Sequence, residues 1–120
     1  MVFDPTQFLD LGKRLVSGFD STEVGLRTAV GRAYYATFLL ARAKSPVNLL
    51  TGGRGASDSH WLVRSAMKKM SHEEIADKLG ALATMRKTCD YDMSQSVKDT
   101  DYDEAIALAD DLMQLLQGIP

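Results

Sequence analysis

Residues 23–43 read EVGLRTAVGRAYYATFLLARA and contain no proline. A helix formed by this stretch would carry small and apolar residues at intervals of three or four on one side, namely Leu26, Val30, Ala33, Thr37, Leu40 and Ala41. Ser21 and Thr22 precede the stretch and can cap its first turn. We therefore expect a long helix from about Glu23 to Ala43, and we expect it to be the central helix of the fold.

A shorter helix is predicted before the central one. Asp4 followed by Pro5 is a typical helix start, because an aspartate accepts a hydrogen bond from the first turn and a proline fits there. This helix should extend to about Ser17. Its apolar stripe is expected to consist of Phe8, Leu11, Leu15 and Val16.

A loop and a third helix are predicted after the central helix. Residues 51–55 read TGGRG, and glycines at this density favour a loop because ordering them costs backbone entropy. Ser57 or Asp58 is then expected to cap a helix that runs to about Met70. Its apolar face is expected to consist of Val63, Met67 and Met70.

Two more helices complete the predicted fold. Ser71 and Glu74 match a capping box, which predicts a fourth helix to about Tyr91. Asp101 is expected to cap a fifth helix that stops at Gly118. The inner face of this fifth helix is expected to consist of Tyr102, Ile106, Ala109, Met113 and Leu116. No strand pattern competes, so the predicted fold class is all-α, an antiparallel bundle of four to five helices in a single domain over residues 1–120.

Composition restricts the classes of protein to consider. The chain has 120 residues, of which 45% are hydrophobic and 25% charged, as in an ordinary globular domain. A single cysteine, Cys89, excludes an internal disulfide and favours a reducing compartment. No signal-peptide pattern, membrane-length apolar run, metal-ligand cluster or cofactor-binding glycine motif is present. We expect a cytoplasmic protein without membrane association, metal or cofactor.

The charges are unevenly distributed along the sequence. Residues 24–71 carry eight basic side chains and one acidic side chain, Asp58, whereas residues 96–120 carry six acidic side chains and one basic side chain, Lys98. A basic segment can bind phosphate groups, and an acidic one can shield it. The alternative is that both are solvated helix faces that partly neutralise each other after folding.

The predicted fourth helix places an arginine on its apolar side. The stripe of this helix reads Ile75, Leu79, Leu82, Arg86, Cys89 and Met93. Because arginine keeps its charge on burial, Arg86 needs a partner, and Asp90 lies one turn further on the same face. Two interpretations stay open. Arg86 and Asp90 form a buried ion pair that fixes the register of the bundle, or Arg86 lines a cleft open to an anionic ligand.

Three motifs together resemble the HEPN domain family, most closely its small stand-alone prokaryotic members. They are RTAVGRAYYATF at residues 27–38, Ser59-His60, and RKTCDY at residues 86–91. Those proteins share an R-A-Y-Y-A segment on one helix, Ser-His or Thr-His at the start of another, and an arginine with a following Asp-Tyr near the bundle centre. The resemblance covers the chain from about Glu23 to its C-terminus. It implies a bundle that usually dimerises, an association with RNA or nucleotides, and often a nucleotidyltransferase partner in toxin-antitoxin pairs.

Many members of this family are metal-independent ribonucleases. Their signature is an arginine, four to six intervening residues and a histidine. Arg86 matches the arginine, but Tyr91, Asp92 and Met93 occupy the positions where the histidine would fall. Tyrosine and aspartate at ordinary pKa values are poor substitutes for imidazole near neutral pH. This departure from the family's motif argues against the ribonuclease catalysis of the family.

We therefore expect a dimeric HEPN-like protein that binds RNA, a nucleotide or a partner protein. The residues predicted to bind are Arg27, Arg32, Tyr35, His60, Arg86, Asp90 and Tyr91. Two alternatives stay open: a metal-independent endoribonuclease toxin that uses Arg86 with Tyr91 or His60, and a purely structural interaction module. His60 follows Arg54 at the family's spacing, but Arg54 lies in the predicted loop. We expect the ring of His60 to bond to the bundle near a helix start.

Overall fold

The computed structural model describes residues 3–51 and 56–120, and this described part is helical without strands. The α-helices are α1 (Thr6–Gly18), α2 (Glu23–Lys44), α3 (Ala56–Lys69), α4 (Glu73–Tyr91) and α5 (Asp99–Gln117), and a short 3₁₀ helix lies at Val47–Leu49. The predicted all-α class is confirmed. Most of the predicted glycine-rich loop, including Arg54, lies outside the described residues.

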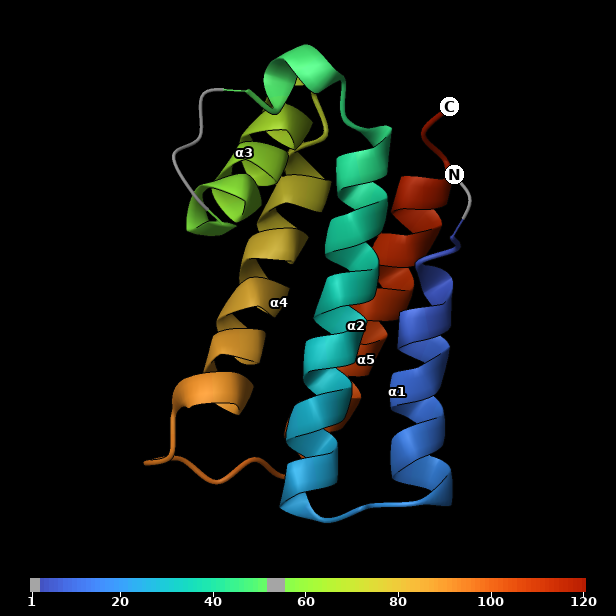
Figure 1. Cartoon of the computed structure of the whole chain (residues 1–120), viewed down its shortest axis with the longest axis vertical. Helices are drawn as coiled ribbons and strands as arrows, with labels where there is room; N and C mark the ends of the chain where they lie inside the picture. The colour runs from blue at the N-terminus through green and yellow to red at the C-terminus, as the bar shows by residue number, and fades with distance from the viewer. Residues whose placement is uncertain (1–2, 52–55) are drawn as a thin grey trace.

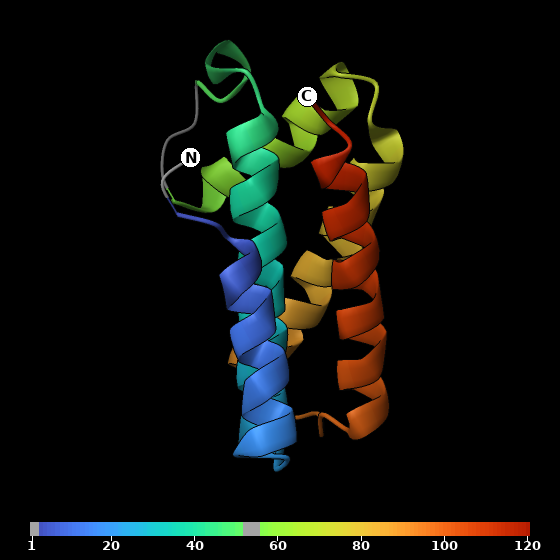
Figure 2. The ribbon, with the colours of Figure 1, turned by 90° about the vertical axis from the view of Figure 1, so that its right-hand side faces the viewer.

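Four of the helices, α1, α2, α4 and α5, run alternately in opposite directions and form an antiparallel bundle (Figure 1). α2 is the central helix, as predicted, because it contacts each of the other four α-helices. α1 and α4 lie on opposite sides of α2, and the turned view separates α5 from the α1–α2 pair (Figures 1 and 2). α3 packs at one end of the bundle, mainly against α4.

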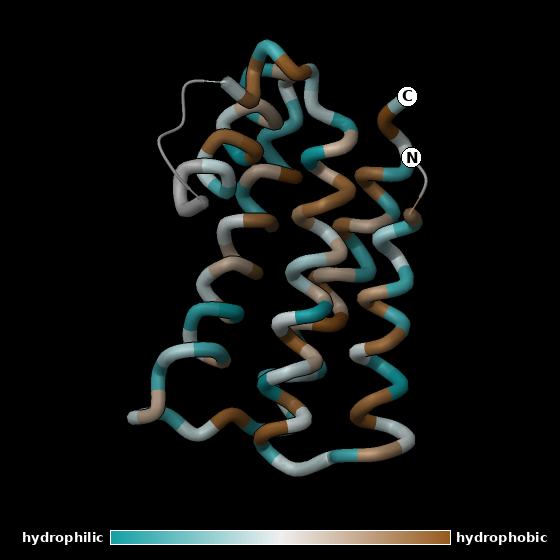
Figure 3. The backbone as a smooth tube through the Cα atoms, in the orientation of Figure 1, coloured by the Kyte–Doolittle hydropathy of each residue, from teal (hydrophilic) through white to brown (hydrophobic). Residues whose placement is uncertain are grey.

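The core follows the predicted side of α2. All six residues of its predicted apolar side are buried, with at most 6% of the residue exposed. α5 contributes Ala105, Ala109, Leu112, Met113 and Leu116, which are also buried. Apolar positions recur along the helices between polar ones, as expected for amphipathic helices around one core (Figure 3).

Two glycines allow helices to approach each other closely. A Cβ atom added to Gly12 of α1 would lie 3.0 Å from the carbonyl oxygen of Ala29 in α2. A Cβ atom added to Gly31 of α2 would lie 3.4 Å from Oδ1 of Asp90 in α4. The small residues of α2 therefore serve close packing, and Gly31 leaves room for a carboxylate between α2 and α4.

Two predicted apolar stripes are wrong in part. Leu11 is 47% exposed, whereas Leu9 is buried, because α1 packs on α2 through the side that carries Gly12. Met93 is 94% exposed, because α4 ends at Tyr91 and Met93 no longer follows the helical repeat.

The predicted helix starts agree with the structure only in part. Asp4 accepts the Thr6 backbone N–H at 3.0 Å and so confirms the start of α1. The side chain of Thr22 does not cap α2; Asp20 instead accepts the Thr22 backbone N–H at 2.8 Å. α3 already begins at Ala56, so Ser57 and Asp58 lie inside it. α5 begins at Asp99, and the carboxylate of Asp101 accepts the Lys98 backbone N–H at 2.9 Å from the first turn.

The predicted capping box at Ser71 is wrong. Ser71 has a φ of 67°, in the left-handed region, and it ends α3 rather than starting α4. The backbone N–H of His72 donates to the carbonyl of Met67 at 2.8 Å, and that of Ser71 donates to the carbonyl of Lys68 at 3.0 Å. This pair of bonds is a Schellman motif, which satisfies the last carbonyls of a helix. Glu74 instead forms an ion pair with Lys78 at 3.0 Å.

Candidate functional site

Arg86 of α4 lies among tyrosine rings and beside the predicted aspartate. Its Nε atom is 2.8 Å from Oδ2 of Asp90, and 17% of its side chain is exposed. Its guanidinium carbon lies 5.8, 5.9 and 5.6 Å from the ring centres of Tyr34, Tyr35 and Tyr91. These distances are typical of cation–π contacts, which suit the flat, weakly hydrated guanidinium group. The structure thus brings together four of the residues predicted to bind, and Tyr34 joins them.

The described residues do not satisfy the hydrogen-bond donors of the Arg86 guanidinium group. The Arg86–Asp90 contact is an ion pair without hydrogen-bond alignment, because the buried Nε–H has no acceptor along its direction in the described part of the chain. The terminal nitrogens of Arg86 make no hydrogen bond to any described residue either. A guanidinium group has five N–H donors that match the oxygens of a carboxylate or phosphate. Arg86 therefore retains donors for an external anion.

His60 of α3 is fixed beside Arg86 by an aromatic cluster. Its Nδ1 atom lies 2.6 Å from the hydroxyl oxygen of Tyr34. Its ring lies 4.3 Å from the ring of Phe38 and 5.5 Å from the ring of Tyr34, measured between centres. The expectation that the ring bonds to the bundle is therefore confirmed. Because Nδ1 is engaged, Nε2 is the nitrogen left for a ligand.

The environment keeps His60 neutral near pH 7. Burial is the largest cause that lowers the pKa of His60, followed by the positive charges of Arg86, Arg64 and Lys87. Burial also raises the pKa of the Tyr34 phenol, so its hydroxyl keeps its proton. If the Tyr34 hydroxyl donates to Nδ1, Nε2–H is a donor; in the other tautomer Nδ1–H donates to Tyr34 and Nε2 is a base.

These side chains line a cleft of about 320 Å³ between α2, α3 and α4. We call it the tyrosine–arginine cleft, and its lining consists of Tyr34, Tyr35, His60, Arg64, Ala83, Arg86, Lys87 and Tyr91. Arg64, Arg86 and Lys87 are cationic, and no carboxylate is among these lining residues. The cleft can accept an anion with an aromatic or sugar group attached.

Sequence reasoning missed Arg64 and Lys87. Arg64 follows His60 by one helical turn, and Lys87 is next to Arg86. The turn spacing on α3 would have been a usable signal, since residues four apart share a helix face. Tyr34 was named only as part of a motif, because a buried tyrosine on the central helix reads as core. It is 2% exposed and still presents its hydroxyl to His60.

The structure places Arg27 outside the cleft. Its guanidinium group ties α2 to the end of α4 and to the loop after it. It donates to backbone carbonyls at 2.5 to 3.0 Å, those of Thr88, Cys89, Asp92 and Gln95. Its Nε–H also donates to Glu23 at 2.9 Å. The hydrogen-bond donors of Arg27 are therefore used within the chain, and Arg27 is not part of the candidate site.

Arg32 is also absent from the lining of the cleft. Its guanidinium carbon lies 5.6 Å from the ring centre of Phe8 and 5.1 Å from that of Tyr35. It thus lies over the ring of Tyr35 and also contacts Phe8 of α1. Asp90 is also absent from the lining of the cleft; it is paired with Arg86 and lies next to Gly31. Both residues thus contact side chains of the cleft without lining it themselves.

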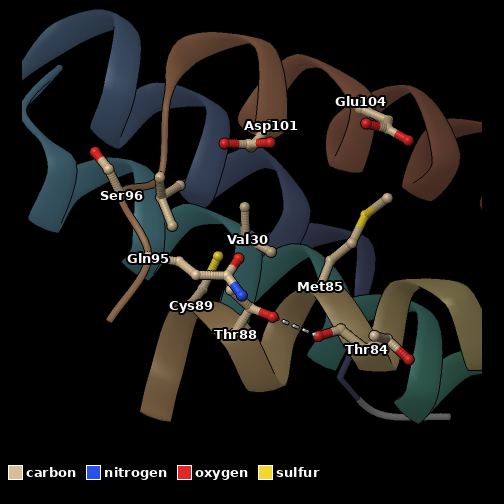
Figure 4. Close-up of a pocket in the computed structure, with 10 residues that line it drawn as sticks. Val30, Thr84, Met85, Thr88, Cys89, Gln95, Ser96, Asp101 and Glu104 are labelled. Atoms are coloured by element: carbon tan, nitrogen blue, oxygen red, sulfur yellow. Dashed lines mark hydrogen bonds between the residues drawn. The ribbon is translucent and has the colours of Figure 1, made fainter. Parts of the chain in front are cut away.

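A second cavity, of about 210 Å³, lies between α2, α4 and the start of α5 (Figure 4). Its walls include Val30, Met85 and Cys89, and Asp101 and Glu104 lie at its α5 side. Burial raises the pKa of the Cys89 thiol, which disfavours the reactive thiolate. This cavity holds none of the residues predicted to bind and has no cationic side chain in its lining.

The predicted charge asymmetry persists in the folded chain. Described ion pairs of the acidic segment join Asp110 to Lys13 and Asp111 to Lys78, both outside residues 24–71. Across the described residues, no ion pair joins the acidic segment to the basic one. Among the described residues, Arg64, Lys68 and Lys69 of α3 and Lys87 of the cleft form no ion pair, whereas Arg86 is paired with Asp90.

Within the described residues, no group of three His, Cys, Asp or Glu side chains is placed to hold a metal ion. No helix in the described ranges is both long and apolar enough to cross a bilayer. Comparisons of the chain with protein-family models, with curated proteins and with solved structures gave no match.

Proposed function

We propose that the chain is a HEPN-like protein that binds a phosphate group of a nucleotide or of single-stranded nucleic acid in the tyrosine–arginine cleft. The observation that carries the proposal is the guanidinium group of Arg86, held among three tyrosine rings with donors that no described residue satisfies. Arg64 and Lys87 add two positive charges to the same cleft. A phosphate group is the anion that this donor set suits best.

The aromatic walls make the cleft suited to a nucleobase as well as to a phosphate group. Tyr91 is 70% exposed at the rim, and Tyr35 is half-buried beside it. Exposed aromatic rings stack on nucleobases, and each such contact contributes about 1–3 kcal/mol to single-strand binding. The cleft therefore offers a phosphate site and a base-stacking surface side by side, which an inorganic anion would use only in part.

Binding of a labelled single-stranded RNA tests this proposal. Fluorescence anisotropy at low salt, in a chelating buffer, compares the wild type with Arg86→Gln. We expect Arg86→Gln to weaken binding about tenfold or more, because charge-assisted hydrogen bonds contribute about 1.5–3 kcal/mol each. Arg14→Gln is the matched control, since Arg14 is exposed on α1 and has the same charge.

Two outcomes would contradict the proposal. One is a folded wild-type protein without salt-sensitive RNA binding. The other is an Arg86→Gln protein that binds RNA as tightly as the wild type. The second outcome would favour a structural interaction module in which Arg86 and Asp90 only fix the register of the bundle.

A second candidate function is metal-independent RNA cleavage, and the position of His60 favours it. The family's histidine is absent from α4, but His60 of α3 lines the same cleft as Arg86 and is neutral near pH 7. In the tautomer with a free Nε2, His60 can accept the proton of a ribose 2′-hydroxyl. The 2′-oxygen then bonds to the adjacent phosphorus, the bond from phosphorus to the 5′-oxygen breaks, and that oxygen takes a proton from water.

Cleavage of a fluorescent RNA in a metal chelator tests this second function. The wild type should produce fragments that end in a 2′,3′-cyclic phosphate, and both His60→Asn and Arg86→Gln should abolish them. If the wild type binds the RNA but leaves it intact after long incubation, the cleavage function is contradicted and the binding function still stands.

A further inference from the structure

A third cavity, of about 400 Å³, lies between α3 and α4 next to the tyrosine–arginine cleft. We call it the α3–α4 groove, and its lining consists of Trp61, Arg64, Ser65, Lys68, Ala76, Asp77 and Gly80. Arg64 lines both the groove and the cleft. The two cavities therefore adjoin each other, and Arg64 lies at their junction.

The α3 side of the groove carries an aromatic ring and two cations in one row. Trp61, Arg64 and Lys68 are spaced three and four residues apart, so they share one face of α3. Trp61 is 60% exposed and contacts no other aromatic ring in the described residues. A large exposed aromatic side chain beside cations is typical of a surface that stacks nucleobases and contacts phosphates.

Arg64 is placed to serve both cavities. A Cβ atom added to Gly80 of α4 would lie 3.7 Å from Cδ of Arg64, so the stem of Arg64 lies over Gly80. The charge of Arg64 also reaches the cleft: after burial and Arg86 it adds to the lowering of the pKa of His60, and it offsets part of the rise that burial causes in the pKa of Tyr34. No described residue forms an ion pair with Arg64, which leaves its guanidinium group for a phosphate.

We infer that the ligand is a single strand of nucleic acid several nucleotides long, which continues from the cleft into the α3–α4 groove, where a base stacks on Trp61 and phosphates contact Arg64 and Lys68. This inference rests on the proposed function of the cleft. The α4 residues along the two cavities extend from Ala76 to Tyr91, which is about 22 Å at 1.5 Å per residue. This length suits on the order of four nucleotides, at the lower end of known single-strand site sizes.

Asp77 places a negative charge beside the proposed path of the strand. It is exposed on α4 and supplies the carboxylate in the lining of the groove. Its negative charge faces the phosphates of the strand, so its removal should tighten binding. This gives the inference a variant with a gain of affinity, which loss of folding cannot imitate.

Oligouridylates of increasing length test the inference by fluorescence anisotropy and by the emission of Trp61, the single tryptophan of the chain. We expect an octanucleotide to bind more tightly than uridine monophosphate and to quench Trp61, whereas the monophosphate leaves its emission unchanged. Trp61→Ala should weaken octanucleotide binding about tenfold, and Trp61→Phe should restore part of the loss. Lys68→Gln should weaken it several-fold, and Asp77→Asn should strengthen it.

The controls separate this inference from the proposed function. Lys69→Gln, an exposed lysine outside both cavities, should leave octanucleotide binding unchanged. If Arg86→Gln weakens binding while Trp61→Ala and Lys68→Gln do not, the inference fails and the cleft function stands. If none of the three variants changes binding, both fail. Equal affinity for a linear polyphosphate of matched charge would also overturn the inference, because it would exclude base stacking on Trp61.

Discussion

The hydroxyl oxygen of Tyr34 lies 2.6 Å from Nδ1 of His60 and joins the central helix to α3. The contact fixes an imidazole at the edge of the core, beside the cations of the cleft. Its position makes the protonation of His60 unfavourable, since the charged ring would lie partly buried and next to Arg86, Arg64 and Lys87.

The stability of the fold should therefore fall at mildly acidic pH. The pKa of His60 is lower in the folded chain than in the unfolded chain, where it is about 6.5, so the unfolded chain binds more protons as the pH falls. The stabilisation is fully present above pH about 6.5 and is lost as the pH falls through the folded pKa. Urea unfolding of the wild type and of His60→Asn between pH 5 and 8 measures this pH dependence of the free energy of unfolding. If the free energy of unfolding of the wild type changes with pH no more than that of His60→Asn, the lowered pKa is contradicted.

Arg27 should matter for stability and not for binding. Arg27→Met removes hydrogen bonds to the end of α4 and leaves several carbonyls without a donor, so we expect the free energy of unfolding to fall by about 3 kcal/mol. Urea denaturation checks the loss. Arg14→Met, at an exposed position of α1, should change stability by no more than about 0.5 kcal/mol. An unchanged stability of Arg27→Met would contradict the structural role.

Ser71→Gly should stabilise the chain. Ser71 has a φ of 67°, and a left-handed conformation costs a residue with a side chain about 1 kcal/mol that glycine does not lose. Denaturant unfolding should show the gain. Ala81→Gly is the control, because Ala81 is exposed within α4, where glycine should cost about 1 kcal/mol. A loss of stability in Ser71→Gly would show that Ser71 does not adopt this conformation.

Helical periodicity predicts most of this fold because burial follows it closely. The apolar side of α2 was correctly expected, since long amphipathic helices present one face to the core. The inner face of α5 was correct only in part: Ala109, Met113 and Leu116 are buried, but Tyr102 and Ile106 are partly buried. Ala105 and Leu112 complete that face instead. Helix ends were less predictable. The choice between Ser71 as the cap of α4 and as part of the turn that closes α3 depends on backbone angles, which a capping-box pattern does not contain.

The candidate site was predictable only where its residues share one helix. Arg86, Asp90 and Tyr91 lie within two turns of α4, and their proximity follows from the sequence. Arg64 and Tyr34 come from other helices, so their contribution depends on how α3 packs against α2 and α4. Arg27 has the same charge as Arg86, but its hydrogen bonds to distant carbonyls cannot be inferred from its position on α2.

The salt dependence of single-stranded RNA binding tests the central claim most directly. A contact between a cation and a phosphate releases a counterion, so the slope of log affinity against log salt is about −0.7 per contact. We predict a negative slope for the wild type, a slope shallower by about 0.7 for Arg86→Gln, and no change for Arg14→Gln. A wild-type slope that Arg86→Gln leaves unaltered would contradict a phosphate contact at Arg86.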